Sequence, residues 1–142
     1  MNKIFIFRVF VSIIIILGIF VFFGKQTNRN VLGDASSFSS LTPTQFSKAP
    51  NSGNFTLIDV RTLDEYTAGH LRSAKQVDYY QTQQFSDYLD SLNKNSDYLI
   101  YCRTGGRSGA VLKLMQEKGF VNVYDMSGGY NAWVASGLSV ER

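Results

Sequence analysis

The only cysteine of this 142-residue chain, Cys102, begins a short glycine-rich loop that also contains two arginines. A thiolate is a strong nucleophile, and the pKa of a thiol falls when backbone N–H groups, a helix N-terminus or guanidinium groups surround it. The glycines let successive N–H groups turn inward, which also creates a site for an anion. We therefore expect Cys102 to be reactive, with a pKa below the ~8.5 of a free cysteine. The loop residues expected around the sulfur are Arg103, Thr104, Gly105, Gly106, Arg107 and Ser108.

Two interpretations of this loop are open from its residues alone. In the first interpretation, the loop activates the Cys102 thiol as described above. In the second, Cys102 is a small buried hydrophobic residue and the glycines form an ordinary strand-to-helix turn. Burial raises the pKa of a thiol and so opposes the effect of the surrounding charges. If the loop does activate Cys102, replacing Arg103 and Arg107 together should raise its pKa and slow its reaction with anionic donors more than with neutral ones.

A strand and a helix on either side of the loop must position the cysteine. Residues 98–101 favour β-structure and follow a cluster of turn residues, which predicts a buried strand that ends at Cys102. Ser108 is predicted to cap the following helix, whose positive N-terminus would also stabilise a thiolate or an anion. The apolar positions of that helix have helical spacing: Val111, Leu114 and Met115.

The rest of residues 41–142 alternates between apolar runs typical of strands and patterns typical of helices. Such alternation predicts an α/β fold with a small parallel sheet flanked by helices, in which ligands bind beyond the carboxyl ends of strands. Cys102 lies at such an end. Further strands are predicted at Phe55–Val60, Ala74–Tyr79 and Val121–Tyr124, and helices from Thr42, over Leu63–Ala68, through Phe85, Tyr88, Leu89 and Leu92, and after the glycine turn of residues 127–133.

Three other residues could do chemistry, and a structural role is favoured for each. Asp59 and Arg61 lie near the carboxyl end of a predicted strand, where they could support the site, but charged neighbours more often form an ion pair. His70 is the only histidine, and the only thiol is Cys102. A metal site would have to use carboxylates almost alone, so we expect no metal and a structural His70.

The formal net charge of +3 arises entirely within residues 1–35. Residues 36–142 contain equal numbers of basic and acidic side chains, which gives no support for nucleic-acid binding. Sixteen uncharged residues run from Val9 to Gly24, and with Arg8 near one end the segment Ile4–Phe23 could span a bilayer. The charge pattern thus points to a membrane segment and not to a basic domain.

The sequence predicts three regions along the chain: a membrane anchor or signal segment at 1–24, a polar, serine-rich tether at 25–40, and one domain at 41–142. An uncleaved anchor is favoured because no small-residue cleavage site directly follows the apolar segment. Its early position and weak charge bias favour an inside N-terminus. We therefore expect an extracytoplasmic domain, in the periplasm or on the outer cell face, or a secreted form if the segment is cleaved.

Three sets of residues together resemble the single-domain rhodanese-like sulfurtransferases. The first runs from Asp59-Val60-Arg61 through Glu65-Tyr66 to Gly69-His70-Leu71 and Ala74, the second from Tyr101 to Ser108, and the third from Gly128 to Trp133 with Gly137. They cover about residues 40–140. Arg72-Ser73 departs from the family pattern, which affects only a local turn.

The resemblance implies a small α/β domain in which Cys102 takes a sulfane sulfur from a small anionic donor such as thiosulfate. The resulting persulfide passes the sulfur to a thiol or cyanide-like acceptor. The resemblance implies no cofactor. Residues 103–108 would bind the donor.

Two other functions remain as alternatives. Phosphatases with a related loop place an arginine six positions after the cysteine, but Ser108 stands there and Arg107 comes one residue early. The shorter loop should fit a sulfur-bearing group better than a phosphate ester. The second alternative is a membrane-tethered persulfide, redox or interaction module with little turnover.

Overall fold

The computed structural model describes residues 37–49 and 54–142, which build one parallel five-stranded sheet with helices on both faces. The strand order is β1-β5-β4-β2-β3, and all neighbours are parallel. The strands are β1 (Ser37–Leu41), β2 (Phe55–Asp59), β3 (Lys75–Gln76), β4 (Asp97–Tyr101) and β5 (Asn122–Met126). The helices are α2 (Pro43–Lys48), α3 (Leu63–Thr67), α4 (Thr82–Ser91), α5 (Gly106–Glu117) and α6 (Gly129–Ala135).

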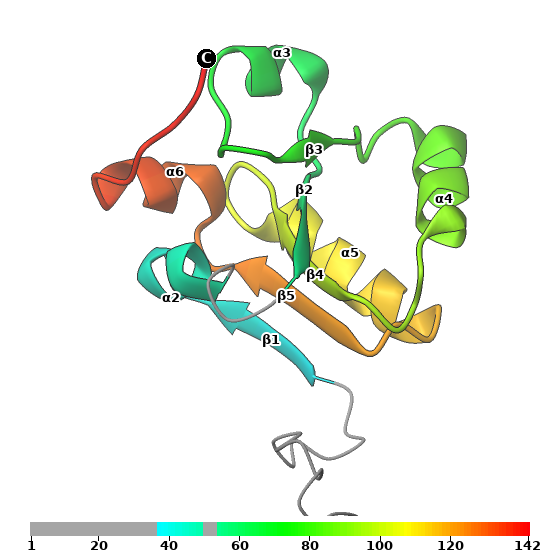
Figure 1. Ribbon diagram of the computed structural model, residues 1–142. Helices are drawn as coiled ribbons and strands as arrows, with labels where there is room; N and C mark the ends of the chain where they lie inside the picture. The colour runs from blue at the N-terminus through cyan, green and yellow to red at the C-terminus, as the bar shows by residue number, and fades with distance from the viewer. Residues whose placement is uncertain (1–36, 50–53) are drawn as a thin grey trace, which may run out of the picture. The chain divides into compact units, whose positions relative to one another are not determined.

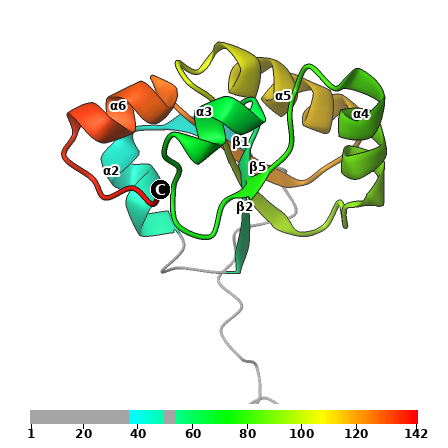
Figure 2. The same cartoon turned by 90° about the horizontal axis from the view of Figure 1, so that it is seen from above.

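The central strand β4 separates two apolar clusters. Its successive side chains point to opposite faces of the sheet, so Ile100 packs with Val111 and Met115 of α5, while Leu99 packs with Phe46 of α2 and Trp133 of α6. Figure 1 and Figure 2 show α4 and α5 on one side of the sheet and α2 and α6 on the other. Residues 98–101 are all buried, which explains their unbroken apolar character.

Two helices start with the hydrogen-bond pattern that their sequences favour. Thr42 before α2 and Thr62 before α3 each accept a hydrogen bond from a backbone N–H at the third helical position, and the residue there, Gln45 or Glu65, caps the threonine N–H in return. The predicted α/β architecture with a parallel sheet is confirmed.

The predicted tether at 25–40 extends too far toward the C-terminus, because its last four residues belong to β1. This strand pairs with β5 from Ser37–Asn122 to Leu41–Met126. In this edge strand only Phe38 and Leu41 pack against the apolar clusters. Its three serines mask the alternating apolar pattern of a strand, so the sequence did not indicate one here. The strand forms because its backbone pairs with the distant segment β5. Residues 1–36, which include the predicted anchor and the rest of the tether, lie outside the described residues.

Three smaller differences concern element boundaries. β5 extends two residues past the predicted Tyr124, β3 is shorter than predicted, and α5 begins at Gly106 and not at Ser108. Gly105 adopts a left-handed conformation (φ 98°) that starts the helix, so the backbone makes the turn before Ser108 is reached. Among the helices of residues 37–49 and 54–142, none has the length and apolar character needed to cross a membrane.

Candidate active site

Cys102 directly follows β4 and is 1% exposed. Its Sγ accepts a hydrogen bond from the Gly105 N–H at 3.1 Å, and the Ser108 hydroxyl lies 3.6 Å away. The left-handed conformation of Gly105 turns its N–H back toward the sulfur. The structure thus places the predicted loop around the thiol, with α5 starting beside it.

Hydrogen bonds control the pKa of the Cys102 thiol. Burial alone would raise this pKa, but hydrogen bonds from Ser108, Thr104 and Gly105 outweigh burial and hold the pKa below its ordinary value. The direction agrees with the sequence prediction. The cause differs in part, because these hydrogen-bond donors carry the effect that was also assigned to Arg103 and Arg107.

Arg107 is already paired with a carboxylate. Its two terminal nitrogens each lie 2.8 Å from an oxygen of Glu65, and its guanidinium lies 5.5 Å from the ring centre of Tyr80. The Arg107 hydrogen bond lowers the pKa of Glu65 to about 2. Arg103 is exposed. The loop therefore offers one exposed guanidinium, that of Arg103, and one that is neutralised by Glu65. The pairing of Arg107 with Glu65 was not predicted from the sequence.

A second glycine turn holds the cysteine loop from behind. The N–H groups of Tyr130 and Asn131, at the start of α6, donate to the carbonyl oxygens of Cys102 and Arg103 at 2.8 and 3.0 Å. Gly129 is left-handed (φ 57°), and a Cβ there would collide with the Cys102 carbonyl oxygen. Figure 1 shows the loop before α5 beside the start of α6. Two segments that the sequence singled out separately thus form one unit.

Asp59 and Arg61 form a buried ion pair with 2.6 Å between Oδ2 and the Arg61 guanidinium. Arg61 also donates to the carbonyl oxygens of Glu65 and Gly69 and lies 4.1 Å from the ring centre of Tyr130. These contacts tie α3 and α6 to the end of β2. Asp59 and Arg61 therefore support the scaffold of the site, as the ion-pair interpretation predicted.

His70 contacts the scaffold. Its ring stacks on Tyr66 with 3.9 Å between centres, and its backbone pairs with Glu141 near the C-terminus. These contacts fit the structural role predicted for it. In the described part of the chain, no three histidine, cysteine or acidic side chains gather as a metal site.

Asp125 is a second acidic residue that the sequence did not single out. It is 3% exposed, lies on β5 beyond the predicted end of that strand, and has an oxygen 3.5 Å from the Ser108 hydroxyl. A carboxylate at the carboxyl end of the strand next to β4 was the available signal. It was missed because the predicted strand ended at Tyr124, directly before Asp125, two residues short of the observed end of β5.

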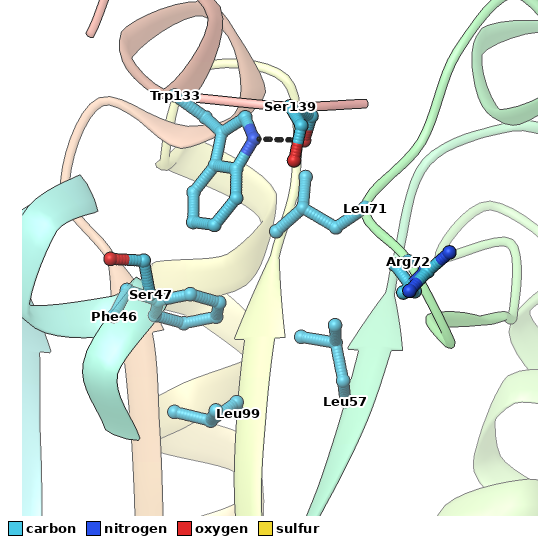
Figure 3. A pocket seen from close by; sticks show the side chains of 8 residues that line it. All are labelled: Phe46, Ser47, Leu57, Leu71, Arg72, Leu99, Trp133 and Ser139. Carbon is cyan, nitrogen blue, oxygen red and sulfur yellow. Dashed lines mark hydrogen bonds between the residues drawn. The ribbon is translucent and has the colours of Figure 1, made fainter. Parts of the chain in front are cut away.

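An apolar pocket of about 120 Å³ lies on the face of the sheet covered by α2 and α6. Figure 3 shows Trp133 above Phe46, with Leu71, Leu57 and Leu99 completing the apolar wall. The Trp133 indole N–H donates to the Ser139 carbonyl oxygen at 2.9 Å. No lining residue belongs to the loop of residues 102–108, so this pocket is separate from the thiol.

Comparison with other proteins identifies relatives across the described domain. Residues 42–136 match the family model described as Rhodanese-like domain. The chain is 38% identical over 101 residues to Rhodanese-like domain-containing protein 17 of Arabidopsis thaliana, and the match covers 63% of this chain and 64% of that protein. It is 33% identical over 79 residues to thiosulfate sulfurtransferase GlpE of Coxiella burnetii, over 56% of this chain and 71% of the relative.

Solved structures agree with these sequence matches. A rhodanese-like domain protein from Staphylococcus aureus has a TM-score of 0.60 and 30% identity, covering 75% of this chain and 100% of that one. A rhodanese-related protein from Thermoplasma volcanium has a TM-score of 0.63 at 21% identity, covering 73% and 98%, and shares the fold. The family match spans more than half of the sequence and includes the cysteine loop. The chain therefore belongs to the rhodanese-like domain family.

Proposed function

We propose that this protein is a sulfurtransferase that carries sulfur as a persulfide on Cys102. The Cys102 thiolate attacks the sulfane sulfur of an anionic donor such as thiosulfate. A new S–S bond forms, the donor's S–S bond breaks, and sulfite leaves with the bonding electron pair. A thiolate or cyanide acceptor then attacks the outer sulfur, and the Cys102 thiolate leaves to complete the cycle.

The observation that carries this proposal is the set of hydrogen-bond donors around a thiol that is almost fully buried. Hydrogen bonds from Ser108, Thr104 and Gly105 stabilise the negative charge on the Cys102 sulfur. They do so in the attacking thiolate of the first step and again when this thiolate leaves in the second step. Exposed Arg103 can attract an anionic donor. Sulfurtransferase relatives, such as thiosulfate sulfurtransferase GlpE, support the same chemistry.

Mass spectrometry of the purified full-length chain tests the proposal. After exposure to thiosulfate, the protein should gain the mass of one sulfur atom, and a thiol reductant should remove it. Repeated turnover with cyanide as acceptor should follow. A chain that gains sulfur without turnover would be a persulfide carrier. A chain that gains no sulfur, or that hydrolyses phosphate esters, would contradict the proposal.

We also propose that residues 4–23 anchor the protein in a membrane, with the domain on the extracytoplasmic side. The uncharged run after Arg8 supports the anchor, and the N-terminal charges support the orientation. Membrane-impermeant reagents are larger than the small molecules that could reach the almost fully buried Cys102, so the probe is placed at an exposed position: Gln84→Cys in a Cys102→Ser background. A membrane-impermeant thiol reagent should label this probe in intact cells. Labelling only after membrane disruption would show that the domain faces the cytoplasm.

A further inference from the structure

A chain of polar side chains leads from the edge strand to the reactive sulfur. Ser40 on β1 donates to Oδ1 of Asp125 on β5, and Oδ2 of Asp125 lies 3.5 Å from the Ser108 hydroxyl of α5. The same hydroxyl lies 3.6 Å from Cys102 Sγ. Asp125 and Ser108 are buried, at 3% and 0% exposure. The mechanism proposed above uses Ser108 but leaves Asp125 without a role.

The Ser108 hydroxyl has one hydrogen to donate and three acceptors around it. These are the Gly105 carbonyl oxygen at 3.3 Å, Asp125 Oδ2 at 3.5 Å and Cys102 Sγ at 3.6 Å. A charged acceptor attracts a hydrogen bond about twice as strongly as a neutral one. The carboxylate of Asp125 and the thiolate of Cys102 therefore compete for the same hydrogen.

Other charges near the sulfur leave this competition in place. The Arg107 guanidinium interacts with Cys102, but it is already neutralised by Glu65. Asp125 lies against the first turn of α5, where a Cβ at Gly109 would be 4.0 Å from Oδ2. Ser40 occupies the other oxygen of Asp125. The carboxylate is thus held with Oδ2 toward Ser108.

We infer that Asp125 is a positioning residue for Cys102. By competing for the hydrogen of the Ser108 hydroxyl, Asp125 controls how strongly this hydroxyl donates to the Cys102 thiolate. When the thiol is protonated, Ser108 donates to the carboxylate. When the thiolate forms, the hydroxyl turns toward the sulfur and Asp125 loses a donor. The effect of Asp125 on the Cys102 thiolate does not depend on the proposed function. Only the consequence for sulfur uptake rests on the proposed function.

Replacement of the carboxylate tests the competition directly. Asp125→Asn keeps the shape of the side chain but removes its charge, so Ser108 donates to the thiolate without a charged competitor. We expect the pKa of Cys102 to fall by about 0.5–1 unit. Ser108→Ala removes the hydroxyl and should raise the pKa. The pKa is measured from the pH dependence of alkylation by iodoacetamide, a neutral reagent, in the full-length chain. Cys102 is the only cysteine, so alkylation reports on it alone.

The double variant Ser108→Ala, Asp125→Asn separates a positioning role from a direct effect of charge. If Asp125 acts through the hydroxyl, the Asp125→Asn shift should largely disappear in the Ser108→Ala background. An equal shift in both backgrounds, or no shift in the folded single variant, would overturn the inference. Asp87→Asn removes an exposed carboxylate of α4 and is the matched control, with no expected shift.

A second variant covers the case in which Asp125→Asn fails to fold. Ser40→Ala removes a donor from the carboxylate at an exposed position of β1. The carboxylate then competes more strongly for the Ser108 hydrogen, so the pKa of Cys102 should rise, opposite to the Asp125→Asn shift. An unchanged pKa in Ser40→Ala would count against the inference. Alkylation does not depend on sulfur transfer, so failure of the proposed function and failure of this inference are distinguishable.

Discussion

Two strand–glycine–helix junctions stand side by side in this domain and do different work. β4 leads through left-handed Gly105 into α5, and β5 leads through left-handed Gly128 into α6. At the first junction, an N–H group donates to the sulfur of Cys102. At the second, the N–H groups of Tyr130 and Asn131 donate to the carbonyl oxygens of the first junction.

The two junctions share the same kind of backbone turn and differ in the acceptor of their N–H groups. The acceptor is a thiol sulfur at the first junction and backbone carbonyl oxygens at the second. The first turn donates a hydrogen bond to the Cys102 sulfur, while the second fixes the position of the first. A glycine turn after a parallel strand therefore does not by itself indicate a catalytic site. The side chain at the strand end decides, and only the first junction contributes a thiol.

Removing that thiol should produce the largest loss of activity. Cys102→Ser should abolish sulfur transfer because no other thiol can form the persulfide. The domain should still fold, because serine is close in size to cysteine. Thiosulfate-to-cyanide turnover and circular dichroism measure the two outcomes. Substantial turnover in a folded Cys102→Ser protein would refute the mechanism.

The second junction can be broken without touching the thiol. Gly129→Ala places a Cβ against the backbone of Cys102 and Arg103 at a left-handed position, and should destabilise the domain by roughly 3 kcal/mol or more. Gly106→Ala is the matched control for stability, because a Cβ there meets no atom within 4 Å and φ is not positive. Denaturant unfolding measures both. Equal stability of the two variants would mean that the second junction does not hold the first.

The junctions also differ in charge, because Arg107 of the first is paired with Glu65. The pKa of Glu65 is lowered from 4.5 to about 2 in the folded protein, so the pair stabilises the fold above pH 4.5 and this contribution is lost as the pH falls toward 2. The loss should be about 2 kcal/mol after solvent screening. Glu65→Gln, which can still cap Thr62, should show a shallower fall in unfolding free energy over this range. Parallel curves for the two proteins would exclude a stabilising pair.

The smallest effect is expected for His70, which belongs to neither junction and contacts Tyr66 and Glu141. His70→Asn removes the stacking on Tyr66 but no contact to the cysteine loop that the structure shows. Turnover should fall by less than tenfold, whereas loss of a general base costs about 10²–10⁴-fold. A drop of that larger size with an intact fold would assign His70 to the chemistry.

Features with a strong local signal could be predicted from the sequence. The capping box at Thr42, the apolar run of β4 and the apolar face of α5 each correspond to an element of the structure. The cysteine loop was predicted as well, because glycine, thiol and arginine occur there together.

Features that depend on distant partners could not be predicted. β1 has few apolar residues, and its pairing partner lies 85 positions away. The pairing of Glu65 with Arg107 spans 42 positions, and that of Asp125 with Ser108 spans 17. Such pairings follow from the order of strands in the sheet, which the alternation of elements does not determine. The membrane anchor at residues 1–24 remains a prediction.

The place of β1 in the sheet has a consequence for biosynthesis. This strand is made before the other four, but its only partner in the described residues, β5, is the last of the five and ends at Met126. The pairing of β1 therefore cannot form until residues 122–126 have left the ribosome, since long-range parallel pairing must wait for both strands. Until then Ser37–Leu41 has no partner strand. Nascent chains arrested before Asn122 should be cut by protease within this segment, while released chains that contain β5 should resist.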